Sequence, residues 1–320
     1  AYGQLESAWP VCGSVLIRDG LAYFAAGRNS FLDGGIFLFA LEPRTGRVVH
    51  QRHMYGPYGA DGFPIESRGV VRGMRLEGFK GDIFLTDDKL LYLRHQAFQR
   101  DLTPVPPQDV QQPHLITSHG FLETIPHHRS FWTIDTALRY DIPTGFGGAH
   151  GDILVMDGDR FYEVRGYQPG RTQSFDPREG GYTLYAGIFG GKPSSSADAG
   201  KATAQAGKRA RKAKRLANAA PITSSTKLWS SAIPLTGKAL ALAGDVLFVA
   251  GTPVAFPEDD LAKAYEGRMG GVLWVASAST GEKLADYKLD APPAWDSLAA
   301  AHGMLFLSLA NGRVVCMGPR

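Results

Sequence analysis

A short hairpin pattern that recurs along the chain constrains the fold more than any other feature. In "GSVLIRDGLAYFAAG" (13–27) an Asp-Gly pair separates two apolar runs of strand length, which predicts a tight β-hairpin. The pattern returns in "DIFLTDDKLLYLR", "DILVMDGDRFYEV", "KALALAGDVLFVAG" and "DSLAAAHGMLFLSL", and in a weaker form in "HLITSHGFLETI" (114–125). The sequence therefore predicts six hairpins.

Two of these hairpins continue in the same way. Residues 34–52 ("GGIFLFALEPRTGRVVHQR") and 270–289 ("GGVLWVASASTGEKLADYKL") each open on Gly-Gly, run through an apolar strand, turn at Thr-Gly and end on a more polar strand. The nearly continuous apolarity of the hairpin strands indicates that both of their faces are covered. We therefore expect an all-β fold, a β-propeller of four-stranded antiparallel blades, with about six to seven blades and eight as the upper alternative.

The composition agrees with many short strands joined by turns. The 320 residues include 39 glycines and 20 prolines, and 44% of the chain is hydrophobic. We expect one propeller domain over residues 1–320, with a low-complexity basic insertion at about 191–225. No apolar run reaches the length of a membrane span. The start at Ala1, without a methionine, fits a processed mature chain or a module excised from a larger polypeptide.

These repeats resemble a known family. The order strand, Asp-Gly, strand, loop, strand, Thr-Gly, strand is similar to the pyrroloquinoline-quinone (PQQ)-like repeat that quinoprotein dehydrogenases share with BamB-like outer-membrane assembly proteins. More narrowly, "GGIFLFALEPRTGRVVHQR", "DIFLTDDKLLYLRHQAF" and "HHRSFW" resemble BamB-like repeat domains of large uncharacterised planctomycete proteins. The resemblance implies a propeller and a periplasmic or otherwise extracytoplasmic location.

The resemblance to this family does not imply that the chain binds PQQ. A PQQ-dependent dehydrogenase needs a platform such as a ring of adjacent cysteines, a calcium set of acidic and amide side chains, and a catalytic Asp. Cys12 and Cys316 are far apart in the sequence, and six hairpins are fewer than the eight blades usual in such enzymes. We therefore expect no cofactor, with PQQ and calcium as the unsupported alternative, and no metal site.

Binding is expected on one rim of the propeller. The tight turns between first and second strands share a rim with the turns between third and fourth strands, and the long loops 27–35, 165–181 and 251–271 lie on the other. Long loops on a rigid scaffold are where ligands usually bind. Arg28, Asn29 and Asp33 offer a cation, an amide and a carboxylate for a polyhydroxylated or anionic ligand. The alternatives are solvated loops, and an Arg28 that pairs with a carboxylate of a neighbouring blade.

Two further sets of ligand-binding candidates come from aromatic residues beside charged ones. In "HHRSFW", His128, Arg129 and Trp132 could hold a planar ligand or a sugar, although a buried structural Trp132 is the more ordinary interpretation. Because neighbouring residues of a strand point to opposite faces, the paired histidines do not predict a metal site. Trp295 and Asp296 form the second set, where the carboxylate could bind a cation and the tryptophan has the same structural alternative.

The charge is concentrated in one segment. Residues 192–215 carry a net charge of +7, so the rest of the chain, at −4, offers no general basic face for nucleic acid. The candidates for contact with a polyanion are Lys208, Arg209, Arg211, Lys212, Lys214 and Arg215. A solvated insertion is the alternative, because no aromatic residues interleave these charges.

The cysteines suggest how the ring closes. Because a propeller brings its first and last blades together, Cys12 and Cys316 are predicted to form a disulfide, which would require an oxidising compartment. The alternative is two small buried hydrophobic side chains.

The sequence names no catalytic nucleophile, since it lacks the common hydrolase, nucleotide-binding and metalloprotease motifs. We therefore expect a noncatalytic module that binds or scaffolds a protein partner or a glycan through its long-loop rim. The alternative is a quinoprotein-type or carbohydrate-active enzyme with its site at the central channel.

Overall fold

The structure is a computed structural model that describes most of the chain. The described residues are 5–30, 32–56, 83–93, 96–106, 109–110, 112–117, 132–135, 149–166, 181–189, 225–254 and 260–318. The chain divides into two compact units, Ala1–Pro143 and Thr144–Arg320.

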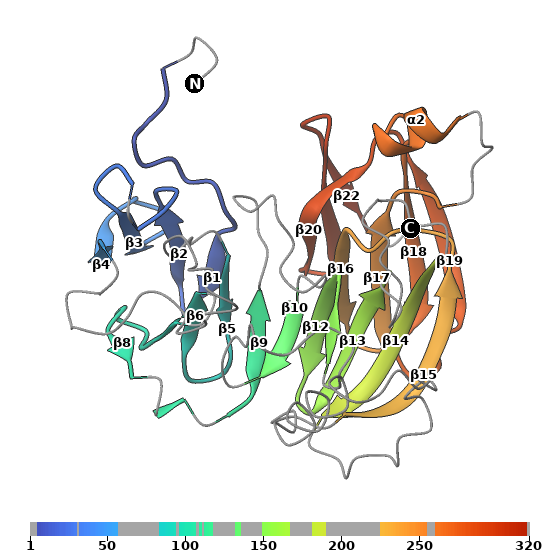
Figure 1. The fold of residues 1–320 in the computed structure, drawn as a ribbon, viewed down its shortest axis with the longest axis horizontal. Coiled ribbons are helices and arrows are strands. Elements are labelled where there is room, and N and C mark those ends of the chain that lie inside the picture. Colours follow the sequence, from blue (N-terminus) through green and yellow to red (C-terminus); the bar gives the residue numbers. More distant parts are fainter. Residues whose placement is uncertain are drawn as a thin grey trace, which may run out of the picture. The chain divides into compact units, whose positions relative to one another are not determined.

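The first unit contains ten strands (Figure 1). Its first sheet comprises β1 (Leu16–Arg18), β2 (Leu21–Ala26), β3 (Ile36–Leu41) and β4 (Val48–Met54). Its second comprises β5 (Phe84–Thr86), β6 (Leu91–Leu93), β7 (Gln96–Phe98) and β8 (Pro104–Val105). In the third, β9 (His114–Thr117) pairs antiparallel with β10 (Trp132–Asp135).

The second unit contains three further sheets. The short β11 (His150–Gly151) precedes the sheet of β12 (Ile153–Asp157), β13 (Arg160–Arg165), β14 (Tyr182–Phe189) and β15 (Ser225–Ile233). The next sheet comprises β16 (Ala239–Ala243), β17 (Val246–Gly251), β18 (Gly271–Ser277) and β19 (Lys283–Leu289), with the short helix α2 (Leu261–Tyr265) between β17 and β18. The last comprises β20 (Pro293–Ala301), β21 (Met304–Leu309) and β22 (Val314–Met317).

These sheets confirm the predicted fold class. The chain is an all-β, six-bladed propeller, and four of the six sheets in its described part have four antiparallel strands in sequence order. None of the described helices is long and apolar enough to span a membrane.

Five of the six predicted hairpins pair within the expected ranges, as in Ile17 with Ala22. The weaker sixth differs, because the partner found for β9 is β10, while the second half of the predicted hairpin, residues 121–125, lies outside the described residues.

The first turn shows how local sequence produces a hairpin. Asp19 and Gly20 have φ angles of 52° and 77°, so both central residues lie in the left-handed region. A two-residue turn of this kind follows the right-handed twist of paired strands, and Asp-Gly is among its preferred sequences. The hairpin is therefore encoded by the two residues at its tip.

The core of the first unit lies between its first two sheets. Along β3, Ile36, Leu38 and Ala40 are buried against side chains of the second sheet that include Phe84, Leu91, Leu93 and Phe98. On β1 only Leu16 packs on this core, whereas Ile17 is 61% exposed. The expectation that both faces of the hairpin strands are covered is therefore wrong for β1, because successive side chains of a strand point to opposite faces.

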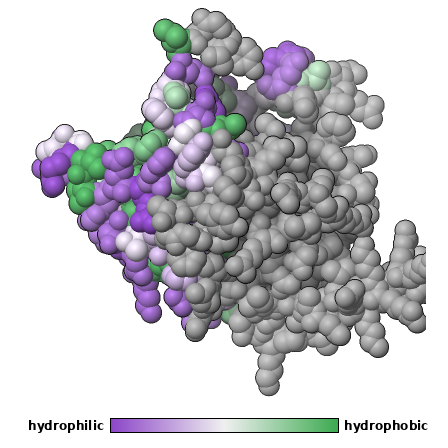
Figure 2. All heavy atoms as spheres, turned by 60° about the vertical axis from the view of Figure 1, so that its left-hand side comes forward, coloured by the Kyte–Doolittle hydropathy of each residue, from purple (hydrophilic) through white to green (hydrophobic). Residues whose placement is uncertain are grey.

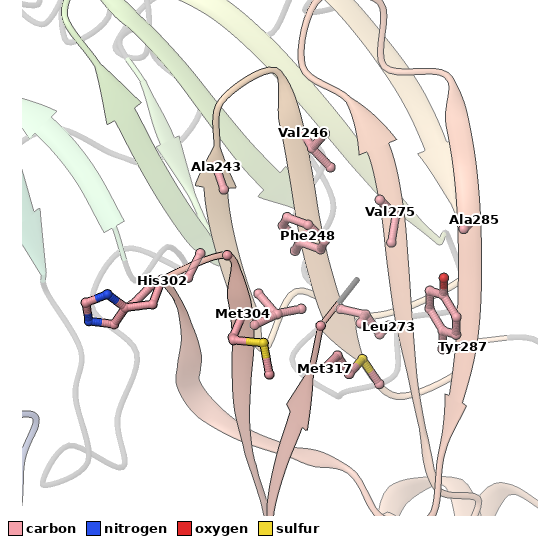
Figure 3. A pocket seen from close by; sticks show the side chains of 15 residues that line it. Ala243, Val246, Phe248, Leu273, Val275, Ala285, Tyr287, His302, Met304 and Met317 are labelled. Carbon is pink, nitrogen blue, oxygen red and sulfur yellow. The ribbon is translucent and has the colours of Figure 1, made fainter. Parts of the chain in front are cut away.

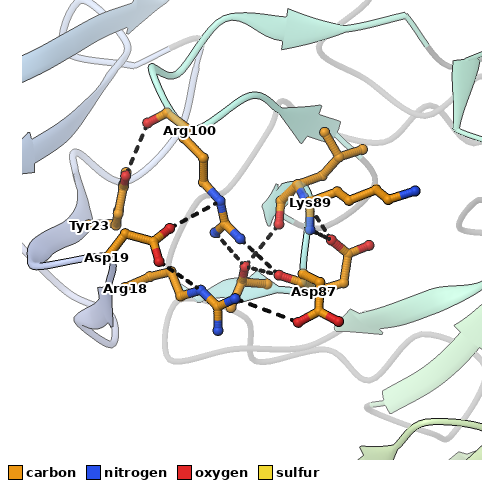
Figure 4. A network of polar contacts seen from close by, with 9 residues as sticks. Arg18, Asp19, Tyr23, Asp87, Lys89 and Arg100 are labelled. Atoms are coloured by element: carbon orange, nitrogen blue, oxygen red, sulfur yellow. Dashed lines mark hydrogen bonds and ion pairs between the residues drawn. The ribbon is translucent and has the colours of Figure 1, made fainter.

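Polar contacts join the tight turns of the first two sheets (Figure 4). Arg100 donates to the Thr86 hydroxyl at 2.7 Å and to the Asp87 carbonyl at 3.0 Å, and its Nε lies 3.5 Å from a carboxylate oxygen of Asp19. In return, the Tyr23 hydroxyl donates to the Arg100 carbonyl at 3.1 Å. These contacts link the β1–β2, β5–β6 and β7–β8 turns.

In the second unit the sheets are held together by close packing. The Trp229 indole on β15 donates to the Ala278 carbonyl at 3.0 Å, and a side chain at Gly281 would overlap its ring. A Cβ at Gly237 would lie 2.6 Å from the Val164 Cβ, so the start of the β16 sheet approaches β13 as closely as glycine allows. Trp229 therefore has a structural role between the two sheets.

Candidate functional site

The loop 27–35, between β2 and β3, is the best-defined part of the long-loop rim. Backbone hydrogen bonds tie it to both flanking segments, from Gly27 to the Pro10 carbonyl at 3.0 Å and from Gly56 to the Ser30 carbonyl at 2.9 Å. Within the loop, Gly35 donates to the Leu32 carbonyl at 2.8 Å. A loop held in this way is organised before any ligand arrives.

Two glycines make this arrangement possible. A Cβ at Gly27, where φ is 115°, would lie 2.6 Å from the Gly35 carbonyl oxygen. Gly35 has a φ of 98°, and a Cβ there would overlap the Met54 carbonyl and lie 3.1 Å from the Tyr55 Cα. Both the backbone angles and the space therefore require glycine, and β4 lies directly against the loop.

The structure brings the three predicted rim residues of this loop together but gives them different environments. Asn29 is buried, and Arg28 forms an ion pair with Glu6 of the N-terminal segment instead of with a neighbouring blade. Asp33 is exposed, has a φ of 53°, and makes no hydrogen bond or ion pair with any described residue. Asp33 is thus the polar side chain most available to a ligand.

Aromatic side chains that sequence reasoning missed lie next to this loop. The Phe37 and His53 rings stack at 4.3 Å with an interplanar angle of 9°, and the Tyr55 ring follows His53 at 6.0 Å and 7°. Trp9 meets Phe37 edge-on at 5.4 Å. The signal was available, because Ile36 and Leu38 belong to the core and period-two alternation turns Phe37 to the other face.

The surface of the first unit is mixed in character. Figure 2 shows both hydrophilic and hydrophobic residues on the described part of the face in view. The exposed hydrophobic side chains near the loop are Trp9, Leu32 and Tyr55. Such a mixed surface is suited to binding and differs from a dry apolar core.

In the second unit, Asp296 lies in the irregular first half of β20. Its φ is 51°, its backbone N–H donates to the Lys238 carbonyl at 2.8 Å, and its carboxylate has no hydrogen-bond or ionic partner among the described residues. Burial raises the pKa of Asp296 to about 7. A half-buried, unpaired acid in an uncommon backbone conformation is typical of binding sites. Trp295 is half-buried on the same strand.

A second acid of this unit is already neutralised. Glu163 on β13 is fully buried and forms an ion pair with Arg165, whose guanidinium lies 4.0 Å above the Tyr185 ring. Burial raises the pKa of Glu163 to about 7, against the lowering effect of Arg165. No group of three or more His, Cys, Asp or Glu side chains converges within the described ranges.

The remaining predicted residues are less informative. Trp132 on β10 is only 2% exposed, which agrees with its structural alternative. His128, Arg129 and the six basic residues of the predicted insertion lie outside the described residues. That insertion falls between β14 and β15, the third and fourth strands of their sheet, as its position predicts. Cys12 is half-buried and Cys316 is exposed, no disulfide joins these two described residues in this structure, and the disulfide stays a prediction.

An apolar cavity of about 1130 Å³ opens in the second unit, between the β16–β19 and β20–β22 sheets (Figure 3). Phe248, Leu273, Met304 and Met317 line it, together with His302 and Gly303 of the β20–β21 turn. The described part of the last sheet has three strands.

Comparison with known proteins gives a fold likeness only. No protein-family model matches the sequence, and no curated protein matches it. The chain is similar to BamB from Moraxella catarrhalis, at 12% identity and a TM-score of 0.38, over 94% of this chain and 70% of that one. It is also similar to the computationally designed protein Ika8, at 9% identity and a TM-score of 0.35, over 98% and 72%. At these values the fold rests on the strand pairing described above.

Proposed function

We propose that this propeller is a noncatalytic binding module that holds a protein partner or a glycan at its long-loop rim. The observation that carries the proposal is the loop 27–35, which is fixed by backbone hydrogen bonds and glycine contacts yet presents an exposed Asp33 with no partner among the described residues. A rigid loop loses little conformational entropy on binding, so a ligand can use the Asp33 carboxylate with only a small entropic penalty.

Charge also supports a binding role for this rim. Arg28 is neutralised by Glu6, so the loop offers a carboxylate acceptor and no free cation of its own. In the second unit, the carboxylate of Asp296 is another acid without a partner among the described residues. Both features favour ligands that donate hydrogen bonds, such as hydroxyl, amide or amine groups.

We place this activity outside the cytoplasm, where the proposed disulfide between Cys12 and Cys316 would be stable. The test of the function uses the immobilised chain, probed separately with extracytoplasmic proteins of the source organism and with polysaccharides. Binding in at least one arm is expected, and it should fall in a combined Arg28→Ala and Asp33→Ala variant.

The matched control is Asp157→Asn, which changes an exposed acid at the opposite, tight-turn end of β12. Binding that survives the rim variant but is lost in the control would contradict the proposal. Turnover of a bound sugar or alcohol would contradict its noncatalytic part.

A further inference from the structure

Resting on the proposed function, we infer that the first blade carries a carbohydrate subsite in which a sugar ring stacks on Tyr55 beside Trp9, with its hydroxyl groups donating to Asp33. The three residues come from different segments, after β4, before β1 and between β2 and β3, and the fold brings them to one end of one sheet. None of the predicted ligand positions of the sequence included Tyr55 or Trp9.

Tyr55 is the last ring of a stack. Phe37, His53 and Tyr55 lie nearly parallel, with interplanar angles of 9° and 7° between successive rings. His53 is held in this plane by a 2.5 Å contact between its Nε2 and the Gly34 carbonyl oxygen. Tyr55 is still 57% exposed. The series of rings therefore ends in an aromatic residue that a ligand can reach.

Trp9 supplies a second surface at a different angle. It is 43% exposed and meets Phe37 at 88°, so it stands nearly perpendicular to the stack. Its Cζ2 atom lies 3.8 Å from the position that a Cβ of Gly34 would take, while Tyr55 borders the neighbouring Gly35. Exposed Gly34 thus borders Trp9, while buried Gly35 borders the backbone of Tyr55.

Asp33 directly precedes Gly34 in the loop. Its carboxylate is exposed and has no partner among the described residues. A carboxylate only accepts hydrogen bonds, and sugar hydroxyls donate them. Aromatic rings pack against the apolar C–H faces of a pyranose, so the two kinds of group match a sugar on its flat and on its polar sides.

Charge favours a neutral or amine-bearing sugar over an acidic one. The nearest cation of the loop, Arg28, is paired with Glu6, while the carboxylate of Asp33 is uncompensated. An acidic sugar would place its charge beside this carboxylate in a site without a free cation in the described part of the loop, and like charges repel.

The experiment is isothermal titration calorimetry of the full chain with cellohexaose, maltohexaose and chitohexaose, and with polygalacturonate as the acidic probe. At least one neutral hexasaccharide should bind, and Tyr55→Ala should weaken that binding about tenfold. Tyr55→Phe should keep most of it, because the ring remains, and Asp33→Asn should give an intermediate loss.

The matched control is Tyr287→Ala, which removes a tyrosine of similar exposure (50%) from β19 in the second unit. Circular dichroism checks that every variant is folded. The inference is overturned when no neutral hexasaccharide binds, when only polygalacturonate binds, or when Tyr55→Ala and Tyr287→Ala behave alike. Rim-dependent binding of a protein in the assay above would then leave the proposed function standing without the carbohydrate subsite.

Discussion

A partly buried hydrogen bond between Asp87 and Tyr92 should contribute to the stability of the second sheet. Asp87 accepts from the backbone N–H groups of Lys89 and Leu90, each at 2.7 Å, and from the Tyr92 hydroxyl at 2.6 Å. The Tyr92 ring is 2% exposed and stacks on His114 at 3.8 Å. Removing the carboxylate leaves the hydroxyl with no partner among the described residues.

The expected loss of unfolding free energy depends on which of these hydrogen-bonding groups can be solvated once the carboxylate is removed. The N–H groups of Lys89 and Leu90 lie at a surface turn and can be solvated, whereas an unsatisfied buried hydroxyl costs about 1–3 kcal/mol. With the loss of the turn contacts, Asp87→Ala should lower the free energy of unfolding by about 2–4 kcal/mol. Tyr92→Phe keeps the ring stack and should cost about 1 kcal/mol.

The two substitutions should not be additive. Once Asp87 is alanine, Tyr92→Phe removes an unsatisfied hydroxyl and should cost nothing or stabilise the protein, which gives a coupling energy of about 1–2 kcal/mol. Urea unfolding followed by circular dichroism on the four proteins of the cycle measures it. The reasoning would be refuted if the two single-substitution costs added up to the cost of the double substitution within about 0.3 kcal/mol.

The pH dependence of the unfolding free energy provides an independent test of the role of Asp87. Burial alone would raise its pKa, but hydrogen bonds from Leu90, Tyr92 and Lys89 outweigh burial and hold the pKa below its ordinary value of 3.8. A lowered pKa in the folded state stabilises the protein above pH 3.8, and this contribution is lost as the pH falls through the folded pKa. The stability difference between the wild type and Asp87→Ala should therefore shrink only below about pH 4.

Three further outcomes are expected. Gly35→Ala should destabilise the protein by several times the cost of Gly46→Ala in thermal unfolding, because only the first substitution places a Cβ against backbone. Asp296→Asn should stabilise the protein at pH 8 and make little difference near pH 4, since a raised folded pKa favours the folded state below the ordinary pKa and loses that advantage as the pH rises through about 7. Thiol titration of the denatured, unreduced protein should detect no free thiol from Cys12 and Cys316, and two reactive thiols would exclude the disulfide.

Much of the candidate site could not be derived from sequence. Loop length and polarity placed Arg28, Asn29 and Asp33 on one rim, and the structure groups them in one loop. Their roles depend on neighbours from elsewhere in the chain, because Arg28 is neutralised by Glu6 and Asn29 is buried.

The aromatic residues show a second limit. Trp9 and Tyr55 lie 46 positions apart in the sequence and reach the same loop only after β4 pairs with β3. Asp296 was selected for its chemistry, but the surroundings of its carboxylate depend on the irregular register at the start of β20.

The sequence by itself determined the hairpins and the place of the basic insertion, because apolar runs and turn residues act between neighbours in the chain. Only the tertiary structure decided which side chains are left without partners. Burial, ion pairing and ring stacking depend on contacts between residues from distant segments of the chain. The exposure of Tyr55, the unpaired carboxylate of Asp33 and the cavity beside the three-stranded last sheet therefore exist only in the assembled fold.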